Sequence, residues 1–498
     1  MPSCSNFSVR YLYRICKLVT SIELDFALWS SSSGIESSCK LYSARETPPA
    51  RLACLDTAFQ DEQHEHNHTP KKISVIERLP YEVLASIFED AHSPDSGLEL
   101  LWSQVSSQWR STAIATPILW RTIQLLVDRP DQFELATLYL ARSKATPIDI
   151  TVTQGPDDSQ HAVAYGKLLC DHIHHCRQLK FCISSLESAG IILGFLVMAS
   201  APLLQSFDAH LPSGYQPADQ ILMGGTPMLA VMHLRASASF LPPLHTVTSL
   251  HIHNIRSDSR IELQHWRDLL SSLPHLISLV INGNVVVFPV WTSGPSVTLP
   301  ALRTLEITIV DMEESESGLL RCLYDTIDAP LLECLSLHNY IDRDLAFLED
   351  SWHFGVTKFP ALDTLILSGL DDGEDACFAH FMRAFPHAQT VIFKGSMMAH
   401  FYELLNLLPE ADGSQPRYWP RLRHLTAIDL QYADRHEMNE LLATCLASRI
   451  AMGKPIETLT LTKTDIDRLP IQSRCLCHPT AAWMDLVKVV EYEREDKA

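Results

Sequence analysis

The chain has 498 residues, which is enough for about three domains or for one extended repeat array. Hydrophobic residues make up 46% and charged residues 20%, so the composition is close to that of soluble globular proteins and excludes a wholly disordered or fibrous chain. The formal net charge of −20 disfavours nucleic acid and anionic membranes, and we expect no nucleic acid and no membrane among the partners.

The N-terminal part predicts a leader followed by a small helical unit. Residues 1–72 contain a serine cluster and a histidine-rich stretch without sustained hydrophobic periodicity, and we expect a disordered leader there. Three short amphipathic helices are predicted within residues 73–125. Pro80 suits the opening of the first helix, and Pro117 must end the third. Three helices in about 45 residues bury little surface on their own, so this unit is expected to need a partner.

The remainder of the chain contains a repeat. Residues 126–200 predict linking helices and irregular first repeats, with a helix over residues 131–142 and a strand over residues 148–152. From residue 201 onward a proline followed by Leu-x-x-Leu-x-Leu, or a close variant, recurs. The prolines at 274, 300, 330, 360 and 386 lie 26, 30, 30 and 26 residues apart, which is a repeat period. Each copy predicts one strand and a returning helix or loop.

The repeats predict an α/β solenoid over residues 201–470, with a curved parallel sheet on the concave side and helices outside. Returning helices are expected over residues 264–273 and 377–385. Residues 471–498 are expected to form a C-terminal helix and an acidic tail, and the helix would cap the array. Its apolar spacing rests on four residues: Trp483, Leu486, Val487 and Val490.

The residues that flank the last leucine of each repeat should point to the concave side, because strand side chains alternate between the two faces. This rule aligns two rows: Asp208, His233, His251, Val280, Glu306, Ser336 and Ile366, and beside them His210, Arg235, His253, Asn282, Thr308, His338 and Ser368. We hypothesise that an acidic or phosphorylated substrate segment binds to the early part of this surface, at His210, His233, Arg235, His251 and His253. The alternative is an ordinary solvated strand surface that is rich in histidine by chance.

The helical unit resembles an F-box. The family pattern Leu-Pro-x-Glu-hydrophobic-Leu matches residues 79–84, and Ile87-Phe88, Val105, Trp109-Arg110 and residues 116–120 follow in the family's order. Trp102 and Ser106 depart from the pattern. The rest of the chain more loosely resembles leucine-rich-repeat F-box proteins. The resemblance implies an α/β fold in which a short three-helix F-box precedes an irregular leucine-rich-repeat-like solenoid.

The same resemblance implies the substrate-recognition subunit of a Skp/cullin/F-box (SCF) ubiquitin ligase. The F-box of this family docks on a Skp-type adaptor and thereby on a cullin, while the repeats capture a protein substrate for ubiquitin-dependent degradation. The chain carries no catalytic residue in this scheme, because ubiquitin transfer occurs on a recruited conjugating enzyme. Carried over residue by residue, the adaptor face or the core beneath it comprises Leu79, Pro80, Leu84, Ile87, Phe88, Val105 and Trp109.

One alternative of another class stays open: a leucine-rich-repeat scaffold whose helical unit is only a terminal cap. An enzyme is disfavoured, because the common P-loop, hydrolase-elbow and zinc-protease motifs are absent. Histidine- and cysteine-containing stretches at residues 64–68, 171–176 and 475–478 lack a second ligand pair at the usual spacing, so we expect no metal and no cofactor. The 13 scattered cysteines are typical of reduced thiols and favour a cytoplasmic or nuclear location.

Overall fold

The structure is a computed structural model, and its chain divides into a unit over Met1–Arg78 and a unit over Leu79–Ala498. The first unit, and with it the expected leader, lies outside the residues that the structure describes. The described residues are 79–92, 97–129, 131–154, 161–211, 220–235, 241–253, 261–287, 295–309, 319–340, 348, 358–368, 378–395, 398–412, 415–428, 435–462, 484 and 486–492.

The second unit begins with the three expected helices, α3 (Tyr81–Ala91), α4 (Leu98–Val105) and α5 (Ser107–Ala115), followed by a 3₁₀ turn, η3 (Pro117–Trp120). Each boundary has a local cause. Gly97 precedes α4 with a φ of 59°, a backbone conformation that costs glycine little. The Ser106 hydroxyl accepts a hydrogen bond from the backbone N–H of Trp109 at 3.2 Å and so caps α5.

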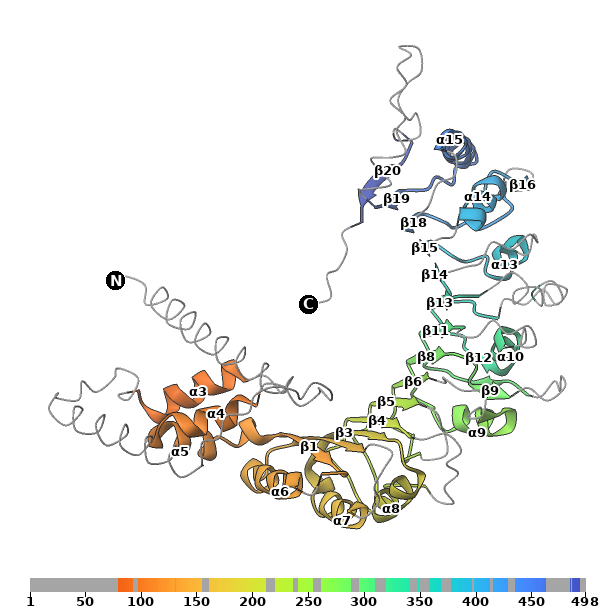
Figure 1. The fold of residues 1–498 in the computed structure, drawn as a ribbon. Coiled ribbons are helices and arrows are strands. Elements are labelled where there is room, and N and C mark those ends of the chain that lie inside the picture. The colour runs from red at the N-terminus through yellow and green to blue at the C-terminus, as the bar shows by residue number, and fades with distance from the viewer. Residues whose placement is uncertain are drawn as a thin grey trace, which may run out of the picture. The chain divides into compact units, whose positions relative to one another are not determined.

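The solenoid is built on one sheet of 14 strands, whose neighbouring pairs are all parallel among the described residues (Figure 1). The strands follow one another in chain order: β1 (Thr122–Leu126), β2 (Ile148–Gln154), β3 (Cys176–Ile183), β4 (Ser206–His210), β5 (Val231–Arg235), β6 (Ser249–His253), β8 (Ser278–Asn282), β11 (Thr304–Thr308), β13 (Cys334–His338), β14 (Thr364–Ser368), β15 (Thr390–Lys394), β18 (His424–Ile428), β19 (Thr458–Leu461) and β20 (Lys488–Glu491). The expected parallel repeat sheet is therefore confirmed.

Helices lie along one side of this sheet, on the outside of its curve, and leave the other side as the concave face (Figure 1). They are α6 (Asp131–Ser143), α7 (Ala162–His172), α8 (Leu186–Leu196), α9 (Leu263–Ser271), α10 (Leu319–Thr326), α13 (Phe378–Ala384), α14 (Met398–Leu407) and α15 (Arg435–Ala451), with a 3₁₀ turn, η4 (Ile173–His175), after α7. Short strand pairs supplement them: β7 (Ile261–Glu262) with β9 (Val286–Val287), β10 (Val297–Thr298) with β12 (Ile327–Asp328), and β16 (Ala411–Asp412) with β17 (Gln415–Pro416).

The core lies between the sheet and the helices and runs without a break from Ile123 to Val487. The leucines of each repeat supply it: Leu302, Leu305 and Ile307 are buried, and so are their counterparts in the neighbouring repeats. Burial of a side chain of this size stabilises the fold by roughly 1.5–3 kcal/mol. Neighbouring repeats share this core, which is why the array folds as a continuous unit.

The structure differs from the sequence interpretation at both ends of the sheet. Residues 122–125, assigned to the helical unit, belong to β1, in which Ile123 and Leu125 are buried. At the other end, residues expected to continue a C-terminal helix form β20, which pairs with β19 and covers an otherwise open strand edge. None of the helices among the described residues is long and apolar enough to span a membrane.

Candidate interaction surfaces

The helical unit has its own small aromatic core. Leu84 and Phe88 are buried, and the Phe88 ring stacks on Trp102 with a centroid distance of 4.5 Å. Trp109 meets the same ring edge-on at 5.1 Å. Two of the seven residues predicted for the adaptor face or the core beneath it, Leu84 and Phe88, therefore belong to the core, and the bulky Trp102, a departure from the family pattern, fills that core.

The other predicted adaptor residues are at least partly accessible. Pro80 is exposed and Val105 is 60% exposed, while Leu79, Ile87 and Trp109 are half-buried. Gln108 donates a hydrogen bond to the Leu79 carbonyl at 2.8 Å, which ties the start of α3 to α5.

Exposed apolar side chains that the sequence interpretation missed extend this surface: Tyr81, Val83 and Ile114. Val83 lies one helical turn before Ile87, so the two side chains share a face of α3. Their apolar character alone does not separate these three residues from the buried apolar residues of the same helices, so the sequence carries no signal for their exposure. We call Pro80, Tyr81, Val83, Val105 and Ile114, together with the half-buried Ile87, the exposed apolar set.

The helical unit is packed onto the first repeat. The Trp120 indole N–H donates to the Ala113 carbonyl at 2.8 Å, and its ring packs against Tyr139 and lies 4.3 Å beneath the Arg142 guanidinium. The Tyr139 hydroxyl donates to the buried Glu99 carboxylate at 2.6 Å. Burial and this bond to Glu99 raise the pKa of Tyr139. These contacts fix the helical unit on α6.

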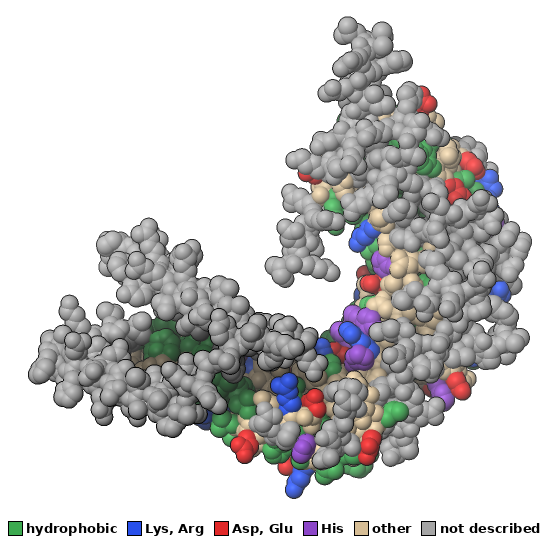
Figure 2. Space-filling view, in the orientation of Figure 1, with side chains coloured by type: hydrophobic (Ala, Val, Ile, Leu, Met, Phe, Trp, Pro, Cys, Tyr) green, Lys and Arg blue, Asp and Glu red, His purple; other side chains and the backbone are tan. Residues whose placement is uncertain are grey.

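The register of the strands confirms the two predicted rows of concave residues. Asp208, His233 and His251 are direct neighbours on β4, β5 and β6, as are His210, Arg235 and His253. The rows continue through β8, β11, β13 and β14 in the predicted order. Figure 2 shows histidine side chains together with basic and acidic side chains along the inner side of the curve.

The structure brings the five predicted substrate-binding residues together on three adjacent strands. The rings of His233 and His251 stack with a centroid distance of 4.4 Å and an interplanar angle of 19°. His251 Nε2 lies 3.1 Å from the Ser249 hydroxyl, and His253 Nδ1 lies 2.7 Å from the Asn282 amide nitrogen. We call His233, Arg235, His251 and His253 the histidine cluster.

Two of the imidazoles in the histidine cluster are harder to protonate than an ordinary histidine. Burial lowers the pKa of His251, and the nearby His233 and His253 lower it further, while Glu306 opposes them. Burial also lowers the pKa of His253, and Arg235 and His233 act in the same direction against the carboxylates of Asp208 and Glu306. Both rings are consequently held largely neutral near pH 7.

Charges of both signs surround the histidine cluster: Lys180 and Arg235 are positive, and Asp208 and Glu306 are negative. Arg235 is exposed and forms no ion pair with any residue in the described ranges. Asp208 is engaged by Lys180, whose Nζ lies 3.5 Å from its Oδ2. Farther along, His338 Nε2 lies 3.7 Å from Glu306 Oε1, and its Nδ1 bonds to the Ser368 hydroxyl.

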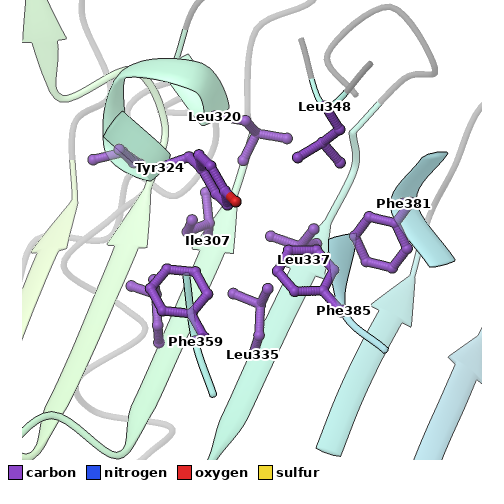
Figure 3. Close-up of a pocket in the computed structure, with 11 residues that line it drawn as sticks. Ile307, Leu320, Tyr324, Leu335, Leu337, Leu348, Phe359, Phe381 and Phe385 are labelled. Carbon is purple, nitrogen blue, oxygen red and sulfur yellow. The ribbon is translucent and has the colours of Figure 1, made fainter. Parts of the chain in front are cut away.

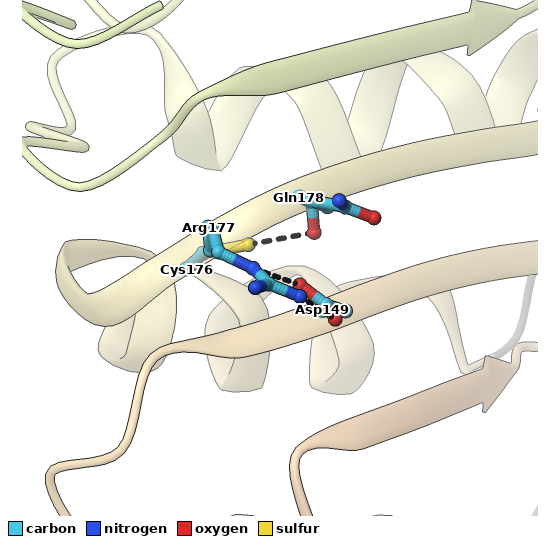
Figure 4. A network of polar contacts seen from close by, with 4 residues as sticks. All are labelled: Asp149, Cys176, Arg177 and Gln178. Carbon is cyan, nitrogen blue, oxygen red and sulfur yellow. Dashed lines mark hydrogen bonds and ion pairs between the residues drawn. The ribbon is translucent and has the colours of Figure 1, made fainter. Parts of the chain in front are cut away.

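The junction of β2 and β3 carries a structural ion pair (Figure 4). The register shifts at Asp149, and Arg177 donates from Nε and Nη2 to the two carboxylate oxygens of Asp149 at 3.0 and 2.6 Å. The adjacent Cys176 thiol donates to the Gln178 carbonyl at 3.0 Å, and burial raises its pKa to about 12. A thiol of this kind is inert at neutral pH.

The part of the chain that the structure describes contains no group of three or more potential metal ligands placed to hold an ion.

A small apolar cavity of about 30 Å³, partly open to solvent, lies between the sheet and the outer helices (Figure 3). Its walls come from β11, β13, α10 and α13 and the segments beside them: Leu305, Ile307, Leu320, Leu323, Tyr324, Leu335, Leu337, Leu348, Phe359, Phe381 and Phe385. It has no charged lining residue and continues the core, so it gives no sign of a polar ligand.

Comparison with known proteins adds little to these observations. No family model matches the chain, and no curated protein matches it. Among solved structures, a chain of the crystal structure of the Rad7 and Elc1 complex in yeast is similar over 90% of this chain and 99% of that chain, at 10% sequence identity and a TM-score of 0.30. Likeness at that level carries no argument about function.

Proposed function

We propose that the protein is a non-catalytic substrate receptor of a ubiquitin ligase of the Skp/cullin/F-box type. The helical unit binds a Skp-type adaptor and brings the chain to a cullin, and the concave face of the solenoid holds the protein substrate. The receptor would accelerate ubiquitin transfer by holding the substrate close to a recruited conjugating enzyme.

One observation carries the proposal. The residues that follow the F-box pattern form three helices around a Leu84–Phe88–Trp102 core and leave the exposed apolar set at the surface. Apolar side chains on short helices are the usual anchors of helix-in-groove association, in which a few buried residues supply most of the binding energy. A Skp-type adaptor is a partner of this kind.

A second candidate function is a repeat scaffold outside any ligase, with the helical unit as a cap. The contacts of Trp120 with Tyr139 and Arg142, and the bond from Tyr139 to Glu99, favour it because they show a unit that covers the first repeat. A cap explains the packing against α6. It does not explain apolar residues such as Val105, which point away from the core into solvent.

Co-purification tests the proposal. Tagged full-length chain is expressed with a Skp-type adaptor and a cullin, and compared with a Val83→Asp/Val105→Asp variant. Both valines are exposed, so the variant should keep its fold while the charges oppose burial in an adaptor groove. Val163→Asp, on α7, is the matched control, because Val163 is 54% exposed and lies outside the helical unit.

The two candidate functions predict different results. A ligase receptor brings down adaptor and cullin as wild type and as Val163→Asp, and loses both in the double variant. A scaffold with a terminal cap brings down neither protein in any form. Circular dichroism of each variant checks that the loss is a loss of binding and not of folding.

A further inference from the structure

Among the described strand residues, the concave face carries more positive than negative side chains, although the chain as a whole has a net charge of −20. Four cationic side chains lie at strand positions that face the concave side: Lys180, Arg235, Lys394 and Lys488. The acidic side chains at such positions are Asp208 and Glu306, together with Asp149, which is paired with Arg177. Lys180, on β3, and Arg235, on β5, are the two that lie near the imidazoles of the histidine cluster, whereas Lys394 and Lys488 lie farther along the sheet. A surface of this composition in an acidic protein favours an anionic ligand.

The histidine cluster can also gain positive charge when an anion approaches. Burial and the positive charge of neighbouring groups such as His233 and Arg235 lower the pKa of His251 and His253. A carboxylate bound in contact with these rings would oppose both effects, because its negative charge stabilises the protonated imidazole. The groups that contact them tolerate protonation. The Ser249 hydroxyl can rotate to accept from His251 Nε2, and the Asn282 amide can present its oxygen to His253 Nδ1.

Resting on the proposed function, we propose that the histidine cluster binds an acidic segment of the protein substrate and that His251 and His253 take up protons as the segment binds. Capture of the substrate therefore strengthens as the pH falls below 7. Arg235 supplies the part of the attraction that does not depend on pH, because its guanidinium stays charged throughout.

The expected size follows from the number of imidazoles. Both rings have a pKa below the ordinary 6.5 in the free protein, and each carboxylate contact raises it. If the two rings together take up on average about two thirds of a proton on binding, binding is about tenfold tighter at about pH 6 than at about pH 7.5.

The test measures anisotropy of a rhodamine-labelled oligoglutamate peptide titrated with the purified full chain at these two pH values. An oligoglutamine peptide controls for contacts that are not ionic. The test variant is His251→Gln/His253→Gln, and the matched control is His424→Gln. His424 lies on the same face of the sheet, on β18, six strands away from β6. His424→Gln therefore removes one imidazole from the concave face and leaves the histidine cluster unchanged.

We expect wild type and His424→Gln to bind oligoglutamate about tenfold more tightly at about pH 6 than at about pH 7.5. In the double variant the affinities at the two pH values should differ by less than about twofold. Arg235→Gln should weaken binding at both pH values and keep the pH dependence. The proposal is overturned if the double variant retains the full dependence, if His424→Gln loses as much, or if wild type does not bind oligoglutamate. The single variants His251→Gln and His253→Gln keep the test decisive should the double variant unfold.

Failure here is distinguishable from failure of the proposed function. A chain that brings down the adaptor but binds oligoglutamate without pH dependence is a receptor for which this inference is wrong. A chain that binds oligoglutamate with the expected dependence but does not bring down the adaptor is a scaffold with an acid-binding face.

Discussion

Removing the Phe88 side chain should unfold the helical unit while the solenoid stays folded. Phe88 is 1% exposed and packs between Trp102 and Trp109. A Phe→Ala change at such a site costs about 3–5 kcal/mol. A unit of about 40 residues has a stability of roughly 2–6 kcal/mol, so the loss is comparable with the whole. Repeats several strands away share no contact with Phe88, and their stability should not change.

Hydrogen exchange followed by mass spectrometry measures this directly. In Phe88→Ala, amides of α3–α5 should exchange faster by about two to three powers of ten, and amides of β11–β15 should exchange as in wild type. Val105→Ala is the control, because its exposed side chain contributes within about 0.5 kcal/mol. Unchanged exchange in α3–α5, or faster exchange through the whole chain, would refute this account of the helical unit.

Three further predictions follow from buried groups. Arg449 is fully buried and donates hydrogen bonds to three backbone carbonyls within residues 418–422. Arg449→Leu leaves these carbonyls unpaired and should lower the free energy of unfolding by about 3–5 kcal/mol. A decrease of less than about 1 kcal/mol, measured by urea denaturation, would contradict this. Tyr139→Phe leaves a Glu99 oxygen unpaired and should cost about 1–3 kcal/mol, seen as faster amide exchange in α4 but not in β15. Burial lowers the pKa of His175 from 6.5, so unfolding takes up a proton as the pH falls through 6.5 and stability is lost below that pH; His175→Gln should show a smaller drop in melting temperature between about pH 7.5 and about pH 5.5 than wild type.

The repeat pattern made most of the sheet predictable. A proline and regularly spaced leucines mark strands such as β11 and β13, because the turn needs a fixed φ and the alternating positions must reach the shared core. The same alternation placed His233 and His251 side by side, and the register confirms it. Strand patterning thus predicts which residues of a solenoid face the concave side.

Features set by contacts between distant segments were not predictable. The strand β3 lacks the proline and leucine pattern, and its place depends on pairing with β2 and β4. The spacing of Val487 and Val490 also suits a helix. This segment forms a strand because it pairs with the edge of β19, and that pairing cannot be seen in the sequence. In the F-box pattern, sequence could not separate the buried Leu84 from accessible residues of the same stripe, since both kinds are apolar.

The binding of a Skp-type adaptor is the central claim, and titration calorimetry with two purified proteins tests it most directly. We predict an equimolar complex of the full chain with the adaptor, weakened at least about tenfold by Val105→Asp, because burial of an unpaired carboxylate costs more than 1.4 kcal/mol. Val163→Asp should bind as wild type does. Absence of binding by the wild-type chain, or equal binding by Val105→Asp, would contradict the assignment of the helical unit as an adaptor-binding F-box.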